Sequence, residues 1–139
     1  MRVKSSFGAD LVKMSEKTIS SKSKLNKDSL ENLFLHQMRC LKIPMPQRKV
    51  KFHPTRQFEW DFVWPSIKFW VEVDGGEYMV KGGHNTGKGI NRDREKDAEA
   101  FLLGYRGLRF TGTMVKDGSA VKYLETALNR GLFNGNLHT

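Results

Sequence analysis

Residues 58–76, F-E-W-D-F-V-W-P-S-I-K-F-W-V-E-V-D-G-G, constrain the fold more than any other stretch of this chain. Aromatic and β-branched residues dominate two runs, 58–63 and 67–73, and Pro65 with Ser66 marks a turn between them. The pattern predicts an antiparallel hairpin. A two-residue loop would be Pro65–Ser66, but proline cannot supply the positive φ of a type I′ turn. We therefore expect a four-residue loop, 64–67.

Side-chain parity along this hairpin separates apolar from acidic residues, because strand side chains alternate. The two-residue loop and the four-residue loop would give the same facing pairs: Glu59 with Glu72, Asp61 with Trp70, and Trp60 with Val71. The residues expected on the apolar face are Phe58, Trp60, Phe62, Phe69, Val71 and Val73. The other face carries four carboxylates, those of Glu59, Asp61, Glu72 and Asp74. Such a patch is either a solvated polar face or a site where a hard divalent metal neutralises the repulsion, and Trp70 amid the acids favours the metal.

Length and charge limit the function classes. The 139 residues suffice for one domain, and the formal charge of +9 favours a polyanionic partner, nucleic acid above an anionic membrane. A single cysteine, Cys40, excludes an internal disulfide and fits a reducing compartment. No apolar run reaches the roughly 20 residues of a membrane span, and no secretory signal opens the chain. We expect a soluble, cytoplasmic protein.

The regions before the hairpin are a basic arm, a helix and a strand. Residues 1–28, rich in Lys and Ser, are expected to be flexible or to order only on nucleic acid. A helix is predicted over 29–41, capped by Asp28 with Glu31 three residues later; Glu31 could equally lean over a neighbouring site. Its apolar stripe consists of Leu30, Leu33, Phe34, Met38 and Leu41. A strand over 47–52 leads into the hairpin.

A loop with six glycines, 75–89, follows the hairpin. Its G-G-H-N-T-G-K-G lacks the Ser or Thr that a phosphate loop needs after G-K, so nucleotide triphosphate binding is rejected. A second helix is predicted over 91–103 and capped by Gly104, with Arg92, Lys96 and Glu99 pointing away from its inner face. The expected inner face consists of Arg94, Ala98, Phe101, Leu102 and Tyr105. A strand over 106–111, a helix over 117–132 and a tail over 133–139 complete the chain.

This order of elements predicts an α/β fold. The strands before and after the second helix can be joined as a crossover, which gives a mixed central sheet flanked by helices.

Five phrases in order along this αβββαβ arrangement resemble the PD-(D/E)XK nuclease superfamily, over about 29–132. They are D-F-V-W-P from Asp61, V-E-V-D-G-G from Val71, G-G-H from Gly82, R-D-R-E-K from Arg92 and G-Y-R-G-L-R-F-T from Gly104. Together they are similar to small phage-type endonucleases and to the very-short-patch-repair and restriction-like branches. The resemblance implies a restriction-endonuclease-like core and a bacterial or phage-infected host cell.

The resemblance also implies site residues. Asp61 and Glu72 would bind Mg²⁺ (or Mn²⁺ in its place), helped by the backbone carbonyl of Val73, and Glu31 matches an acidic residue supplied by the first helix. The motif lysine is replaced by Asp74. Lys96 is the first candidate to supply the missing lysine and Arg94 the second.

These residues permit metal-assisted hydrolysis of a phosphodiester. Asp74 could take a second ion or act through water, and His84 could donate to the scissile phosphate or join the metal's outer shell. Plain structural roles compete with each: an exposed strand face for Asp61 and Glu72, a helix cap for Glu31, a turn for Asp74, a loop histidine for His84 and a solvated helix position for Lys96.

Backbone contacts to DNA are expected from the basic arm and from Lys51, Arg56, Lys81, Lys88 and Arg92. Trp64 and Trp70 could be stacking platforms for bases, whereas Trp60 is expected in the core.

Three functions remain open at this point. The leading one is a Mg²⁺-dependent DNA endonuclease of nicking, junction-resolving or repair type, for which a homodimer would explain double-strand or junction cutting. The second is a non-cleaving DNA-binding accessory subunit that keeps a nuclease-like fold. The third is an RNA-directed nuclease.

Overall fold

The computed structural model describes residues 26–75 and 87–131. In chain order they form α2 (Lys27–Cys40), β1 (Gln47–Lys51), β2 (Glu59–Trp64), a 3-10 turn (Pro65–Ile67), β3 (Phe69–Asp74), α3 (Gly87–Leu102), β4 (Arg106–Thr111), α4 (Gly112–Lys116) and α5 (Ser119–Asn129). No helix among the described residues is long and apolar enough to cross a bilayer.

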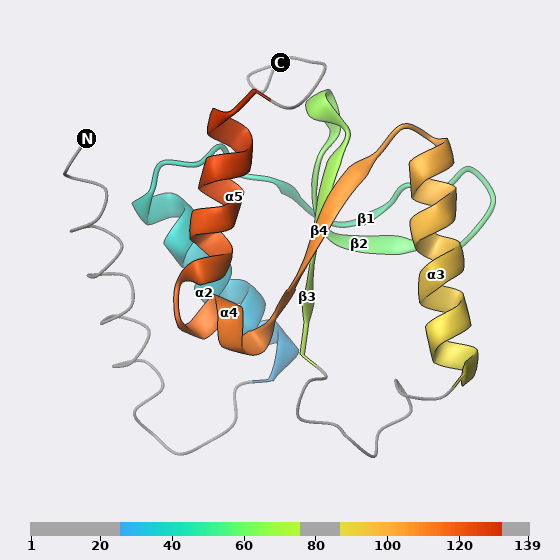
Figure 1. The fold of residues 1–139 in the computed structure, drawn as a ribbon, viewed down its shortest axis with the longest axis horizontal. Coiled ribbons are helices and arrows are strands. Elements are labelled where there is room, and N and C mark those ends of the chain that lie inside the picture. The colour runs from blue at the N-terminus through green and yellow to red at the C-terminus, as the bar shows by residue number, and fades with distance from the viewer. Residues whose placement is uncertain (1–25, 76–86, 132–139) are drawn as a thin grey trace.

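The strands form one mixed sheet in the order β1-β2-β3-β4. β2 pairs antiparallel with both β1 and β3, and β4 pairs parallel with β3 after the chain has crossed over through α3. Helices α2, α4 and α5 lie on one side of the sheet and α3 lies on the other (Figure 1). The prediction of a mixed sheet flanked by helices is confirmed.

The larger core lies between the sheet and the α2, α4 and α5 layer. Phe34 of α2 makes edge-on contacts with Phe62 and Phe110, at centroid distances of 5.6 and 5.9 Å. Val121 and Leu124 of α5 are fully buried in the same cluster, as their helical spacing predicts.

Helix α2 begins two residues before the predicted start. The Asn26 side chain, and not that of Asp28, caps it by accepting a hydrogen bond from the Ser29 N–H at 2.8 Å. Lys27 therefore belongs to the first turn of the helix, four residues before Glu31 and on the same side.

The hairpin loop has the predicted length but lies one residue further along the chain. The 3-10 turn runs over Pro65–Ile67, and Lys68 closes it with a left-handed φ of 50°. This shifts the register by two residues, so that Val63, and not Asp61, faces Trp70. The predicted pairing was wrong because proline starts a 3-10 turn well and does not have to be its second residue.

The alternation of side chains is interrupted at Asp61, which corrects the predicted apolar face. Phe62 points into the core beneath α2, as do Phe69, Val71 and Val73. Trp60 instead joins Trp70 and Ala100 in a second cluster beneath α3. Phe58 is near the same cluster, because Phe52 stacks on both Phe58 and Trp60.

Helix α3 presents the opposite side to the one predicted. Phe101 and Leu102 are 77% and 75% exposed, whereas Ala100 is fully buried against the second cluster. The indoles of Trp60 and Trp70 already fill the space above the sheet. A small residue and long polar side chains fit over them, and large apolar side chains do not.

The helix predicted over 117–132 is observed as α5, which begins two residues later and ends at Asn129, and the short helix α4 before it was not predicted. Thr111 caps α4 by accepting a hydrogen bond from the Met114 N–H at 3.2 Å. Gly118, with a φ of 84°, then turns the chain into α5. Only glycine adopts this left-handed conformation at little cost, so Gly118 was the signal for the break.

Candidate active site

Asp61 of β2 and Glu72 of β3 are brought together where the regular pairing of these strands ends. The Asp61 N–H donates to Glu72 Oε2 at 3.2 Å, and the Val73 N–H donates to Asp61 Oδ2 at 2.9 Å. Each carboxylate thus accepts a backbone hydrogen bond from the neighbouring strand. Both residues are buried, at 6% and 7% exposure. The two carboxylates that the sequence singles out therefore form one buried pair.

Lys27 places its ammonium group against one side of this pair. Its Nζ lies 2.7 Å from Asp61 Oδ2, 3.0 Å from the Val73 carbonyl oxygen and 3.5 Å from Glu31 Oε2. These three oxygens belong to three of the four predicted metal ligands. Glu31 is fully buried and also receives a hydrogen bond from Arg48 at 3.0 Å.

Lys96 of α3 reaches the other side of the pair. Its Nζ lies 2.6 Å from Glu72 Oε1 and 4.2 Å from the centroid of the Trp60 ring, and its side chain is only 13% exposed. The prediction that Lys96 points away from the sheet is wrong, while its proposed place beside the acidic pair agrees with the geometry. The ring beneath it attracts the cation and holds the ammonium in position.

Two stacked indoles form the floor of the site. Trp60 and Trp70 lie 3.6 Å apart with an interplanar angle of 5°. Trp70 lies so close to β4 that a Cβ on Gly107 would be 1.9 Å from its ring. Arg109, two residues along β4, lies over both rings and donates to Asp97 at 2.7 Å.

The two carboxyls have opposite pKa shifts. Burial, the neighbouring Asp61 carboxyl and its charge raise the pKa of Glu72 to about 7, against the lowering effect of Lys96. Burial also acts to raise the pKa of Asp61, but hydrogen bonds with Glu72, Lys27 and the Val73 N–H outweigh it and leave that pKa below its usual value. Near neutral pH, Asp61 is ionised while Glu72 exchanges a proton, which is the behaviour expected of a coupled pair.

The donor atoms suit a hard divalent cation. Three oxygens already surround the Lys27 ammonium, which takes the place of a metal cation. The fully buried Glu31 Oε2 has no hydrogen-bond partner in the described part of the chain. Mg²⁺ takes oxygen ligands of this kind. Within residues 26–75 and 87–131, no three His, Cys, Asp or Glu side chains are grouped so that they could hold a metal alone. The backbone carbonyl of Val73 would therefore have to be part of the ligand set.

The structure places the other predicted catalytic residues less centrally. Asp74 is exposed at the end of β3, and Glu59 is exposed at the start of β2, so only two of the four predicted carboxylates meet. His84 lies outside the described residues. All three tryptophans are buried, at 0% for Trp60, 3% for Trp64 and 7% for Trp70. This confirms the prediction for Trp60 and removes Trp64 and Trp70 as stacking platforms for bases.

Two of the predicted DNA contacts converge on one aromatic ring. Arg56 and Arg92 both lie over the Phe58 ring, at 4.4 and 5.0 Å from its centroid, and both are exposed. Lys88 is exposed in the first turn of α3, and Lys51 is exposed and donates to Gln57. Lys81 lies outside the described residues.

Sequence reasoning missed Lys27, Arg48 and Arg109. The signal for Lys27 was its spacing of four residues from Glu31, which becomes visible once Asn26 is taken as the cap. The signal for Arg109 was its strand parity with Gly107, which places both on the side of the sheet that faces α3.

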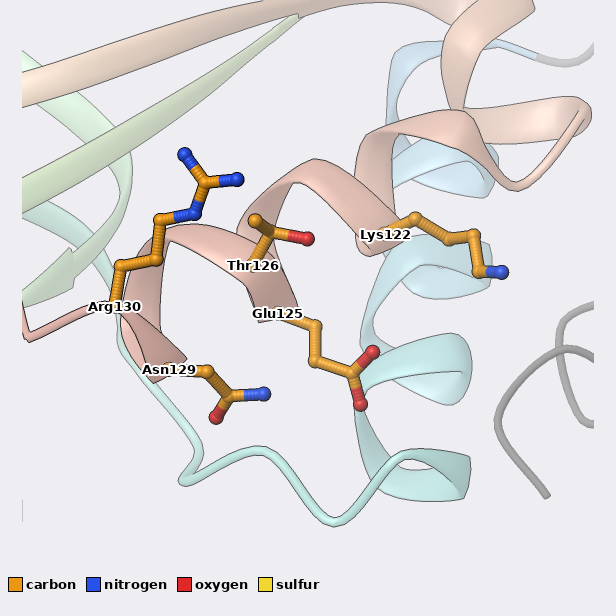
Figure 2. A pocket seen from close by; sticks show the side chains of 5 residues that line it. All are labelled: Lys122, Glu125, Thr126, Asn129 and Arg130. Atoms are coloured by element: carbon orange, nitrogen blue, oxygen red, sulfur yellow. The ribbon is translucent and has the colours of Figure 1, made fainter. Parts of the chain in front are cut away.

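The pocket in Figure 2 lies along α5, lined by Lys122, Glu125, Thr126, Asn129 and Arg130. None of these residues contacts the acidic pair in the structure.

A scan against protein-family models and searches of curated proteins and solved structures found no match to this chain.

Proposed function

We propose that this protein is a metal-dependent DNA endonuclease that hydrolyses phosphodiester bonds, in a nicking, junction-resolving or repair-type reaction. The observation that carries the proposal is the buried pair of Asp61 and Glu72, which has one lysine on either side. One of these lysines, Lys27, is surrounded by oxygen atoms that could also bind a metal.

The burial of these carboxylates favours a functional role over a structural one. Buried ion pairs add little to stability, because desolvation of the charges offsets their attraction. In a protein that only bound DNA, carboxylates facing the phosphates would also lower the affinity for DNA, because like charges repel. Perturbed pKa values in a group of charged residues are typical of active sites.

In the proposed mechanism, Asp61, Glu72, Glu31 and the Val73 carbonyl would hold the metal. Bound there, Mg²⁺ would lower the pKa of a coordinated water and offset the negative charge that develops on the phosphate. Lys96, fixed between Glu72 and the Trp60 ring, would take the part of the absent motif lysine and orient the attacking water.

The remaining residues have supporting parts in the proposal. Arg56 and Arg92 would hold the DNA backbone beside the pair, together with Lys51, Lys81 and Lys88. Asp74 would act on a second ion or through water from its exposed position, and His84 would donate to the scissile phosphate. Contacts of this kind fix the position of the backbone and read no bases.

One observation favours the second candidate, a non-cleaving accessory subunit that binds DNA. Both carboxylates already have a lysine partner, at 2.7 Å from Asp61 and 2.6 Å from Glu72. A site neutralised in this way would be stable without a metal and inert towards phosphate esters.

Cleavage of supercoiled plasmid, of a branched DNA and of an RNA distinguishes the candidate functions. The reactions compare Mg²⁺, Mn²⁺ and EDTA for the wild type, for Asp61→Asn and for the control Glu59→Gln, which removes an exposed carboxylate from the same strand. We expect metal-dependent cutting that is lost only in Asp61→Asn. DNA binding without cutting under any metal would support the accessory subunit, and cutting of RNA alone would support the third function.

A further inference from the structure

We propose that the Lys27 ammonium occupies the metal position in the metal-free protein. A divalent ion must displace this ammonium in order to bind. This inference rests on the proposed function, because it concerns how the same site takes its metal. Lys27 would neutralise the site in the metal-free protein and would thereby set its affinity for the ion.

The contacts of the Lys27 ammonium are those expected for a cation in an oxygen cage. Its Nζ has one oxygen each from α2, β2 and β3, at 3.5, 2.7 and 3.0 Å. A metal held by Asp61, Val73 and Glu31 would need the same space. The longest contact is the one to Glu31, so this buried carboxylate gains most when a smaller ion with shorter ligand distances replaces the ammonium.

The balance of charges in the site also indicates that a protein cation has to leave when a divalent metal binds. Glu31, Asp61 and Glu72 bring three carboxylates, and Lys27, Arg48 and Lys96 each lie within 3.0 Å of one of them. Lys49 and Arg109 lie a little further away, at 3.7 Å from Glu31 and 3.9 Å from Glu72, so the cations of the metal-free site at least balance its carboxylates. A divalent ion added without the loss of a cation would be repelled by the ammonium in its place.

Only one of the two lysines beside the pair is free to move. The Lys27 side chain is 45% exposed and starts from the first turn of α2, so its flexible stem can turn to solvent without disturbing the core. The Lys96 side chain is 13% exposed and lies over Trp60. Lys27 is thus the displaceable cation and Lys96 the fixed one.

The test measures Mn²⁺ binding to the DNA-free protein by calorimetry. We expect Lys27→Gln to bind Mn²⁺ at least tenfold more tightly than the wild type, which corresponds to about 1.4 kcal/mol. The matched control is Lys49→Gln. It removes the same charge from a lysine 3.7 Å from Glu31 that is outside the cage, and it should change affinity less than threefold.

A second measurement needs no variant. The Lys27 amine should react with an acylating reagent several-fold faster once Mn²⁺ is added, when the labelled peptide is quantified by mass spectrometry with Lys122 as the internal reference.

Four results would overturn the inference. Equal tightening in both variants would make the effect one of general charge. Unchanged Mn²⁺ affinity in Lys27→Gln, or unchanged labelling of Lys27, would show that the ammonium stays in place, and the proposed nuclease would survive. Absence of Mn²⁺ binding in the wild type and in both variants would overturn the metal-dependent function together with the inference.

Discussion

Glu72 is the residue whose protonation depends most on its surroundings. Its pKa is raised from 4.5 to about 7 in the folded protein. Between these values the unfolded chain releases a proton that the folded chain keeps, so the free energy of unfolding falls as the pH rises through this window. At 1.36 kcal/mol per pKa unit, the loss amounts to about 3 kcal/mol. The lowered pKa of Asp61 changes the free energy of unfolding only below pH 3.8, its ordinary pKa, and so does not contribute to the pH dependence in this window.

Urea unfolding in EDTA at pH 5 and pH 7.5 measures this contribution. We expect the free energy of unfolding of the wild type to fall by about 1–3 kcal/mol more than that of Glu72→Gln between pH 5 and pH 7.5. Glutamine keeps the shape of the side chain and does not titrate. Titrating groups that the two proteins share cancel in the comparison. Equal losses in the two proteins would contradict the shifted pKa.

Lys96 is the residue on which the proposed chemistry depends most directly. We predict that Lys96→Ala lowers the cleavage rate by about 10²–10⁴-fold, because the attacking water loses the group that orients it. DNA affinity should change little, since the ammonium is turned inward to Glu72. The matched control is Lys122→Ala on α5, and the measurement is single-turnover cleavage beside a binding isotherm. Near-normal cleavage would remove Lys96 from the mechanism.

At the scale of elements, β3 and β4 approach each other closely at Gly107. Gly107 faces Trp70 in register, and a Cβ there would overlap the indole. We predict that Gly107→Ala lowers the free energy of unfolding by about 1–3 kcal/mol, because the Trp60 and Trp70 stack has to shift.

The control for this change is Gly87→Ala at the start of α3, where an added Cβ meets nothing within 4 Å. That variant should be neutral or slightly stabilising, because alanine favours helix more than glycine does. Thermal unfolding of both variants tests the pair. Equal stability of the two would show that Trp70 adjusts without cost.

Prediction at this scale succeeded where periodicity and burial agree. Strand β4 was predicted at its observed bounds, and the stripe of α5 was found, since both bury apolar residues at the spacing of their element. It failed for α3, whose apolar stripe faces outward, and at Asp61, where the alternation breaks. Both failures occur beside the candidate site, where two tryptophans replace the usual apolar core and the facing helix has to be polar.

At the scale of the whole molecule, α3 leaves a row of side chains on the surface. Ile90, Phe101 and Leu102 are at least 43% exposed, and Arg94 and Ala98 between them are exposed as well. Two pairs of these positions, Ile90 with Leu102 and Arg94 with Ala98, are symmetric about residue 96, and Phe101 lies next to Leu102. In an antiparallel pair of α3 helices, Ile90 of one copy would meet Leu102 of the other, which is the self-complementary arrangement of a twofold interface.

We therefore predict a homodimer that forms through α3. Sedimentation should show a dimer for the wild type and a monomer for Phe101→Glu with Leu102→Glu, with the same far-ultraviolet circular dichroism. Tyr123→Glu is the matched control, because it changes an aromatic residue of α5 that is 61% exposed. A monomeric wild type, or dissociation by the control, would contradict this interface.

The basic arm stays a prediction from the sequence. Residues 1–25 contain six basic and two acidic side chains. Their deletion should reduce the slope of log affinity against log salt, because fewer counterions are released from the DNA. The truncation keeps Asn26 and Lys27, so the cap of α2 and the site remain whole. An unchanged slope would remove the arm from the DNA contacts.

The candidate site shows the limit of a single sequence most clearly. Asp61 and Glu72 were identified from a motif and Lys96 as a candidate for its missing lysine, and the structure brings the three together. The place of Lys27 depends on where α2 begins, which one capping side chain decides. Strand parity with Gly107 fixes the side of β4 on which Arg109 lies, but its place beside Glu72 depends on the parallel pairing of β4 with β3, a contact between distant parts of the chain.

The stacked pair of Trp60 and Trp70 also gives the molecule an optical reporter of its own. Arg109 lies over both indoles and Lys96 over that of Trp60, whereas Trp64 lies in the other core beneath α2. Ion or DNA binding that moves these cations would change the emission of two tryptophans and leave the third as a steady background. The intrinsic fluorescence of the unlabelled protein can therefore follow events at the candidate site in real time.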